Sequence, residues 1–201
     1  MTMRPKLYLA GPEVFLAEAR EIGRRKTDRC ADYGFEGLYP FDADVIAAGG
    51  EAPDRQIYRA NVAMLHAADA GIFNLTPFRG PSADAGTLFE LGLMSGLGKP
   101  CFAYTNDPRT LLERMQQSDD GLRDAATGLW ADRLGRTIEN FGNSDNLMID
   151  VALAEQGADF FIRPAGDAIL PLDDLSGFSE CLTRACRYFG LRDDTQAKRR
   201  T

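Results

Sequence analysis

Histidine is almost absent from this chain: His66 is the one histidine among 201 residues. It stands in the middle of a stretch predicted to be helical, between Leu65 and Ala67. A zinc site or a Ser-His-Asp triad would have to use it. We interpret His66 as structural, and the carboxylates are too scattered to form a metal cage. We therefore expect catalysis without histidine, without a metal and without any other cofactor.

Paired cysteine motifs are missing too. The closest two of the four cysteines, Cys181 and Cys186, are five residues apart, which matches neither a zinc pair nor a redox Cys-x-x-Cys pair. Inert thiols in a reducing cytosol are the simplest interpretation. The apolar run at the amino end, 7–10, is too short for a signal peptide, and no run approaches the length of a membrane span. We expect a cytoplasmic protein that does not bind membranes.

Positive charge is scarce, since the formal net charge is −7. The cluster Arg24, Arg25 and Lys26 lies on a predicted helix and is interpreted as a solvated face, so nucleic-acid binding is not expected. The chain has neither G-x-G-x-x-G nor a Walker A motif, and the turn after the first predicted strand is Gly11-Pro12. Dinucleotide and nucleoside triphosphate binding are therefore unsupported.

Predicted strands and helices alternate along the chain. Strands are predicted at 6–10, 35–39, 70–75, 99–104 and 160–162, and helices at 13–33, 53–68, 84–98, 111–115, 146–156 and from 173 or 174 to about 190. This order indicates an α/β fold with a doubly wound, parallel, five-stranded sheet of the flavodoxin-like type, flanked by helices. We expect one domain over 1–190 and a flexible tail at 191–201. A loop is expected over 42–52, with Asp42 and Asp44 as surface acids.

The stretch 69–98 is the centre of this organisation: an apolar strand, a loop rich in proline and glycine, and a helix. Two carboxylates, Asp84 and Glu90, lie where the strand passes to the helix. In open parallel sheets this is where ligands bind. The apolar positions that recur at helical spacing are Phe89, Leu93 and Leu97.

Glu90 is the one charged residue in the stretch 85–97. Such an acid is either desolvated and primed for chemistry or exposed on the solvent face. A carboxylate beside a phenol is suited to attack on a glycosyl carbon, and Tyr8 in the first predicted strand supplies a phenol. From the residues alone, the favoured interpretation of Tyr8 is a half-buried strand residue with its hydroxyl in solvent. The residues alone leave these alternatives open.

Four segments of the chain resemble the nucleoside 2-deoxyribosyltransferase family: 8–15, 55–61, 74–92 and 144–149. The most specific is the family's acid-x5-Glu-x-Gly signature, which here starts at Asp84 and contains Glu90. The amino-terminal Tyr8 and the late Asp145-Asn146 pair occur in the family's order. The likeness extends from about residue 6 to about residue 150.

The resemblance implies a transfer in two steps. Glu90 matches the nucleophile that attacks C1′ of a 2′-deoxynucleoside and holds the sugar as an ester, which a second base then displaces with overall retention. Tyr8 matches the phenol that orients this carboxylate, and a 2′-hydroxyl would crowd the pair. Asp84 matches the residue that holds the 5′-hydroxyl. An acid there would repel a phosphate, so free nucleosides are expected, not nucleotides.

The resemblance also implies how substrate is bound. Asn146 matches a residue donated to the sugar hydroxyls of a neighbouring subunit, with Met148 beside it, so at least a dimer is expected. Without the family, Asn146 is interpreted as a helix N-terminal residue. Gly11, Pro12 and Phe15 would line the base pocket, with Phe15 as a stacking surface.

Asn61 departs from the family pattern. Some members have an aspartate there that is proposed to protonate the leaving base. An amide cannot act as an acid, so Asn61 is expected to recognise the base edge. The proton would come from water or from another acid such as Glu13.

The expected activity is therefore transfer of a 2-deoxyribosyl group between nucleobases, with small deoxynucleosides and free nucleobases as partners. One alternative is an N-glycosidase in which water replaces the second base, acting on deoxynucleosides or nucleoside 5′-monophosphates. Another is a non-catalytic nucleoside- or nucleotide-sensing module, because a fold does not determine function.

Overall fold

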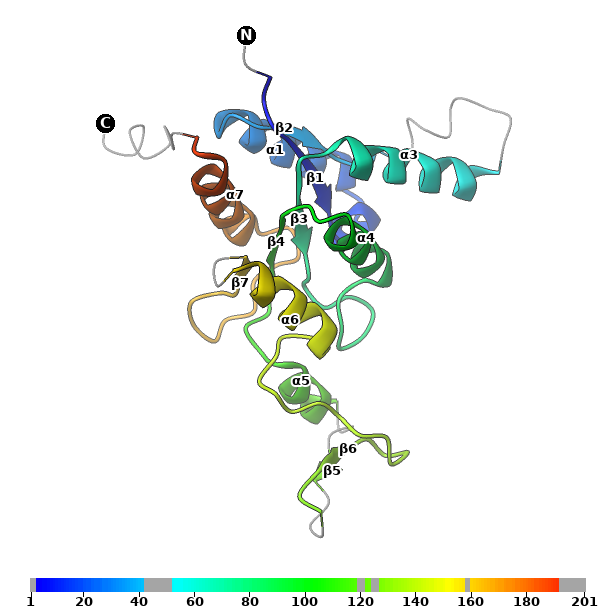
Figure 1. Cartoon of the computed structure of the whole chain (residues 1–201). Helices are drawn as coiled ribbons and strands as arrows, with labels where there is room; N and C mark the ends of the chain where they lie inside the picture. Colours follow the sequence, from blue (N-terminus) through cyan, green and yellow to red (C-terminus); the bar gives the residue numbers. More distant parts are fainter. Residues whose placement is uncertain (1–2, 42–51, 119–121, 124–126, 158–159, 192–201) are drawn as a thin grey trace.

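The computed structural model describes residues 3–41, 52–118, 122–123, 127–157 and 160–191. Asp42, Asp44 and residues 192–201 of the predicted tail lie outside these described residues. A five-stranded sheet forms the centre of the part that is described (Figure 1).

Neighbouring strands of this sheet are all parallel, in the order β2-β1-β3-β4-β7. The strands are β1 (Lys6–Ala10), β2 (Glu36–Leu38), β3 (Ala70–Asn74), β4 (Cys101–Tyr104) and β7 (Phe161–Ile162). The flavodoxin-like prediction is confirmed, because each predicted strand overlaps an observed one. Strand order reverses at β1, which has β2 on one side and β3 on the other. Sheets of this type bind ligands at the carboxyl ends of the strands beside such a reversal.

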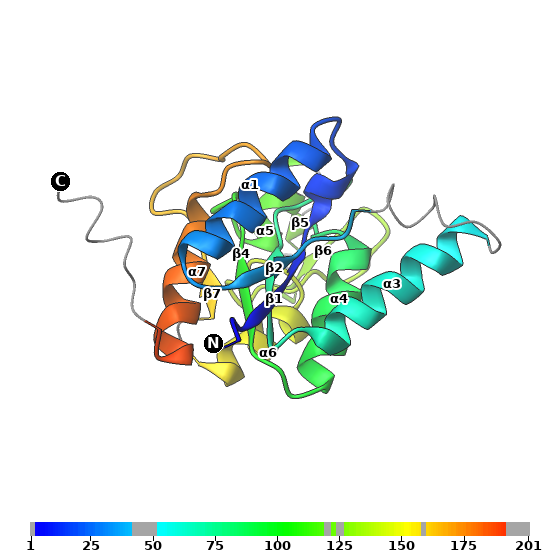
Figure 2. The same ribbon diagram turned by 90° about the horizontal axis from the view of Figure 1, so that it is seen from above.

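Helices cover both faces of the sheet. One face is covered by α1 (Ala19–Asp32) and α7 (Ser176–Phe189), and the other by α3 (Pro53–Ala67), α4 (Ala85–Gly96) and α6 (Leu147–Gln156) (Figure 2). Successive side chains of a strand point to opposite faces. Leu7 and Leu9 therefore join the cluster under α1 and α7, whereas Tyr8 joins the cluster with Leu91 and Met94 of α4. This alternation brings the Tyr8 phenol to the face that α4 covers.

A smaller unit follows β4. The predicted helix at 111–115 is confirmed as α5 (Leu111–Gln117). After it, β5 (Leu122–Arg123) pairs antiparallel with β6 (Trp130–Ala131), at the carboxyl-end side of the sheet (Figure 1). This pairing was not predicted, because two-residue strands are too short to show a period of two.

The helix predicted over 13–33 is interrupted in the structure. A 3-10 helix, η1, spans Pro12–Phe15, and α1 begins only at Ala19. His66 is the penultimate residue of α3 and is exposed, so its predicted place in the middle of the helix is wrong. None of the helices in the described ranges combines the length and the apolar character needed to cross a bilayer.

The buried face of α4 differs from the expected one. Phe89 and Leu97 are 55% and 40% exposed, and the buried residues are Thr87, Leu91 and Met94. Both sets follow helical spacing, and α4 has apolar residues on most of its circumference. Periodicity alone cannot choose the face of such a helix. Packing on the sheet does so, and it leaves Glu90 at the boundary between the two faces.

The four cysteines are buried as free thiols. Burial raises the pKa of Cys30 and of Cys101 to about 12. A thiol with so high a pKa carries almost no thiolate at neutral pH, in agreement with the inert role expected from sequence.

Candidate active site

Tyr8 of β1 and Glu90 of α4 meet on the face of the sheet that α4 covers. The Tyr8 hydroxyl donates a hydrogen bond of 2.6 Å to Glu90 Oε1, between residues 82 positions apart in the chain. Tyr8 is fully buried and Glu90 is half-buried. The alternative in which the Tyr8 hydroxyl lies in solvent therefore does not hold. The pair offers a carboxylate oriented by a phenol, which is what a carboxylate nucleophile needs.

Asp84 is the N-cap of α4. Its Oδ2 accepts hydrogen bonds from the Thr87 backbone N–H at 2.9 Å and from the Thr87 hydroxyl at 3.1 Å. The cap holds the half-buried carboxylate at the positive end of the helix dipole. The family resemblance implies that Asp84 holds the sugar 5′-hydroxyl, and both of the Thr87 hydrogen bonds use Oδ2.

The turn after β1 is tightly packed. Gly11 and Pro12 are buried, and a Cβ atom at Gly11 would lie 2.2 Å from Glu13 Oε2 and 2.6 Å from Asn74 Cβ. Only glycine fits there. Asn74 Nδ2 donates to Glu13 Oε2 at 3.0 Å, and Asn74 Oδ1 accepts from the Thr76 backbone N–H at 3.0 Å. The ends of β1 and β3 are thus joined behind the predicted base pocket.

Lys26 lies behind this turn. It was predicted to be solvated with Arg24, but it is fully buried and forms an ion pair with Glu13. Its ammonium nitrogen lies 5.1 Å from the ring centroid of Phe178 and 5.6 Å from that of Tyr104. Burial lowers the pKa of Lys26 to about 7, whereas the adjoining carboxylate favours the charged form. Glu13 is enclosed by these partners, so we do not assign the proton for the leaving base to it.

Phe15 lies on the other side of the same turn and is 53% exposed. Its ring stacks on Phe78, with centroids 5.3 Å apart and an interplanar angle of 11°. The Arg79 guanidinium carbon lies 4.9 Å from the Phe15 centroid and 4.7 Å from the Phe78 centroid. Arg79 has φ 56°, in the left-handed region. No sequence pattern pointed to Phe78 or Arg79, because their contact depends on how the loop after β3 folds back.

Asn61 lies half-buried on α3, which packs beside α4. One turn earlier on α3, the ring of Tyr58 lies 6.4 Å from that of Phe89 on α4. The helix thus places the Asn61 amide on the same side of the sheet as the Tyr8–Glu90 pair. Its role towards the base remains a prediction.

Asn146 and Met148 stand at the start of α6. Asn146 Oδ1 accepts from the Met148 backbone N–H at 3.0 Å, so it caps the helix, and Nδ2 donates to Glu139 Oε1 at 2.7 Å. Both residues are exposed, Met148 by 72%. Asn146 stands at the start of the helix, as the residues alone predict, and it is itself the N-cap. This exposure is compatible with contact to a second chain.

A cavity of about 690 Å³ borders the loop 76–81. Its lining includes Arg109, Arg114 and Arg136, each of which already donates to a protein acceptor. Among the described residues, no three His, Cys, Asp or Glu side chains are grouped to hold a metal ion.

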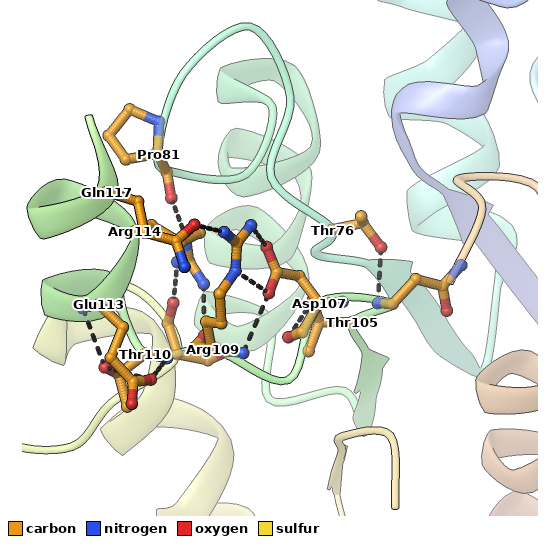
Figure 3. A network of polar contacts seen from close by, with 11 residues as sticks. Thr76, Pro81, Thr105, Asp107, Arg109, Thr110, Glu113, Arg114 and Gln117 are labelled. Atoms are coloured by element: carbon orange, nitrogen blue, oxygen red, sulfur yellow. Dashed lines mark hydrogen bonds and ion pairs between the residues drawn. The ribbon is translucent and has the colours of Figure 1, made fainter. Parts of the chain in front are cut away.

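Asp107 and Arg109 form an ion pair at the edge of this cavity (Figure 3). Burial acts to raise the pKa of Asp107, but the hydrogen bonds and charge of Arg109 outweigh it and hold the pKa below its ordinary value. A carboxyl group with a lowered folded-state pKa stabilises the fold at higher pH, and this contribution is lost as pH falls through that pKa.

Asp107→Asn is therefore expected to lower the free energy of unfolding at neutral pH and to make it less dependent on pH below 3.8. Denaturant titrations at neutral pH and at several acidic pH values measure this. The matched control is Asp28→Asn on the exposed side of α1. In this variant the free energy of unfolding should fall with acidic pH as it does in the wild type. The prediction would be contradicted if the free energy of unfolding of Asp107→Asn depended on acidic pH as strongly as that of the wild type.

Comparison with known proteins places these residues in a family. A family model described as nucleoside 2-deoxyribosyltransferase matches residues 7–148. An uncharacterised protein of Schizosaccharomyces pombe is 33% identical over 179 residues, which cover 80% of this chain and 84% of that protein.

Two solved structures resemble the fold. A 2-deoxyribosyltransferase from Leishmania mexicana is 30% identical with a TM-score of 0.57, over 72% of this chain and 85% of that one. A conserved protein from Enterococcus faecalis is 18% identical with a TM-score of 0.53, over 91% of this chain and 99% of that one, and supports the fold alone. The matched range 7–148 includes every residue that the sequence assigned to the site.

Proposed function

The chain belongs to the nucleoside 2-deoxyribosyltransferase family, and from that premise we propose that it transfers the 2-deoxyribosyl group of free 2′-deoxynucleosides from one nucleobase to another. The observation that carries the proposal is the hydrogen bond of 2.6 Å from the Tyr8 hydroxyl to Glu90 Oε1. It joins the two residues that the family assigns to nucleophile and orienting phenol. A sensing module has no need of a half-buried carboxylate held in this way.

The proposed reaction has two displacements at one carbon. The Glu90 carboxylate attacks C1′ as the bond to the first base breaks, and the base leaves with the electron pair and takes a proton from water. A nitrogen of the second base then attacks C1′, gives its proton to water and displaces the carboxylate, so the β configuration is retained. Tyr8 holds one carboxylate oxygen throughout. Asn61 recognises the base edge, and Gly11, Pro12 and Phe15 line the base pocket.

Asp84 sets the preference for nucleosides over nucleotides. It is proposed to accept a hydrogen bond from the 5′-hydroxyl, and its charge at this half-buried position would repel a 5′-phosphate. A 2′-hydroxyl would meet the Tyr8–Glu90 pair, which favours 2′-deoxy sugars.

We further propose that the active unit is at least a dimer, in which Asn146 and Met148 reach the neighbouring site. Their exposure at the start of α6 supports this assignment. We propose that residues 1–190 form the one domain that carries out the reaction.

The proposal is tested by incubating a 2′-deoxynucleoside with and without a second free base. We expect the second base to raise the rate of nucleoside consumption and to appear as a new 2′-deoxynucleoside of β configuration. Release of free deoxyribose at one rate in both mixtures would identify an N-glycosidase. Binding of the nucleoside with no turnover would identify a sensing module, and either result would overturn the transferase.

A further inference from the structure

Two buried charged side chains connect the turn before α4 with the turn before α6. Asp145 is 2% exposed, and its Oδ2 accepts the Ala83 backbone N–H at 2.7 Å, 62 residues away in the chain. Its Oδ1 accepts the Asn146 backbone N–H at 2.8 Å. One carboxylate therefore holds the backbone next to Asp84 and the backbone of Asn146 at once.

Arg114 connects the same two turns from the side of α5. It is 6% exposed, and its guanidinium donates to three backbone carbonyls. Nε donates to Pro81 at 2.6 Å and Nη1 donates to Arg109 at 2.5 Å (Figure 3). Nη2 donates to Ser144. The loop 81–84 and the turn 144–146 are thus joined by two side chains of opposite charge.

The turn 144–146 is itself held from behind. Asp150, in the first turn of α6, accepts the backbone N–H groups of Ser144 at 2.8 Å and of Asp145 at 2.9 Å. Arg163 donates to the same carboxylate at 2.8 Å. The backbone that carries Asp145 is therefore held in place. A change in the length of the Asp145 side chain or in its acceptor atoms would affect both turns.

We infer that Asp145 and Arg114 are positioning residues that hold Asp84 and Asn146 in a fixed relation, an inference that rests on the proposed function. Each acts through the backbone beside the residues proposed to bind the sugar hydroxyls. In the proposed dimer, Asp84 belongs to the active site of its own chain and Asn146 reaches that of the neighbour. Asp145 and Arg114 together, here called the clamp, therefore connect two active sites through one chain.

The test compares two substrates in Asp145→Asn. The asparagine keeps the size of the side chain, but its amide nitrogen cannot accept, so one of the two N–H groups loses its acceptor. For a 2′-deoxynucleoside, kcat/KM is expected to fall about 10- to 100-fold, as for a small misplacement of a binding group. For the matching 2′,5′-dideoxynucleoside, which lacks the 5′-hydroxyl, the loss should be smaller by at least about 3-fold, because only the contact of Asn146 to the remaining sugar hydroxyl is then affected.

Arg114→Lys is the second variant, because it keeps the charge but cannot reach three carbonyls with a planar fork. It should show the same dependence on the 5′-hydroxyl. Asp132→Asn is the matched control: Asp132 also accepts backbone N–H groups in a turn, from Leu134 and Arg136, but beyond β6. It should leave kcat/KM unchanged for both substrates.

Equal losses on the two substrates, or no loss, would overturn the inference and leave the transferase in place. Unfolding of both Asp145→Asn and Arg114→Lys in circular dichroism would also overturn it, since the clamp would then serve stability alone. A wild-type chain that turns over no 2′-deoxynucleoside is a different result, because it rejects the proposed function itself.

Discussion

Replacement of Glu90 by glutamine is expected to stop base exchange, with kcat lower by at least about 10⁴-fold. The amide has nearly the shape of the carboxylate and still accepts the hydrogen bond from Tyr8, but its oxygen carries no charge and is a poor nucleophile for C1′. Glu90→Ala should remove activity equally while leaving the fold intact. The measurement is steady-state formation of new nucleoside from a 2′-deoxynucleoside and a second base.

The matched control is Glu36→Gln. Glu36 is also a glutamate, but it lies opposite Lys6 at the amino end of β1 and is exposed, so the control tests the charge change away from the site. We expect wild-type kcat from it. Mass spectrometry of acid-quenched mixtures should find a deoxyribosyl ester on Glu90 in the wild type and none in Glu90→Gln. Transfer retained by Glu90→Ala would reject Glu90 as the nucleophile.

Removal of the Lys26 charge should have the largest effect on stability. Lys26→Met leaves the Glu13 carboxylate fully buried without its cation, and breaking a buried pair in this way costs about 3–5 kcal/mol. The free energy of unfolding is measured by urea titration near neutral pH. The added variant Glu13→Gln in the Lys26→Met chain should recover part of the loss, because no unpaired charge is then buried.

Arg24→Met on the same helix is the matched control. Arg24 is exposed and pairs with Glu21 three residues earlier, so its loss should change the free energy of unfolding by no more than about 0.5 kcal/mol. Losses of the same size for Lys26→Met and Arg24→Met would show that the buried pair contributes nothing beyond a surface charge. Activity of the folded fraction of Lys26→Met reports separately on whether the turn at Gly11 depends on this pair.

The alternation of apolar runs with amphipathic segments determined the fold class. A strand buried on both faces is a short apolar run, and a helix is a longer periodic one, so both signals are local. The same holds for the connection from β3 to α4, where the Pro/Gly loop and the two acids Asp84 and Glu90 are visible within one stretch. Local chemistry was enough to place candidate residues at that edge.

The chain by itself did not show which charges are buried. Lys26 follows two exposed arginines, and the three residues share the same surroundings in the sequence. Packing of α1 against α7 nevertheless encloses it with Glu13. The buried face of α4 was likewise decided by the sheet, because apolar residues surround most of that helix. Burial is a property of the packed neighbours, and periodicity carries no information about them when the pattern is apolar all round.

The sequence by itself therefore determined the order of the α-helices and of the strands in the main sheet, the family likeness and the two acids Asp84 and Glu90 of the central strand–helix stretch. Only the tertiary structure decided that the Tyr8 hydroxyl lies 2.6 Å from Glu90 and that Asp145 connects Ala83 with Asn146. Both contacts join segments more than 60 residues apart in the chain. Such contacts depend on how the elements pack together, which no local pattern of residues encodes.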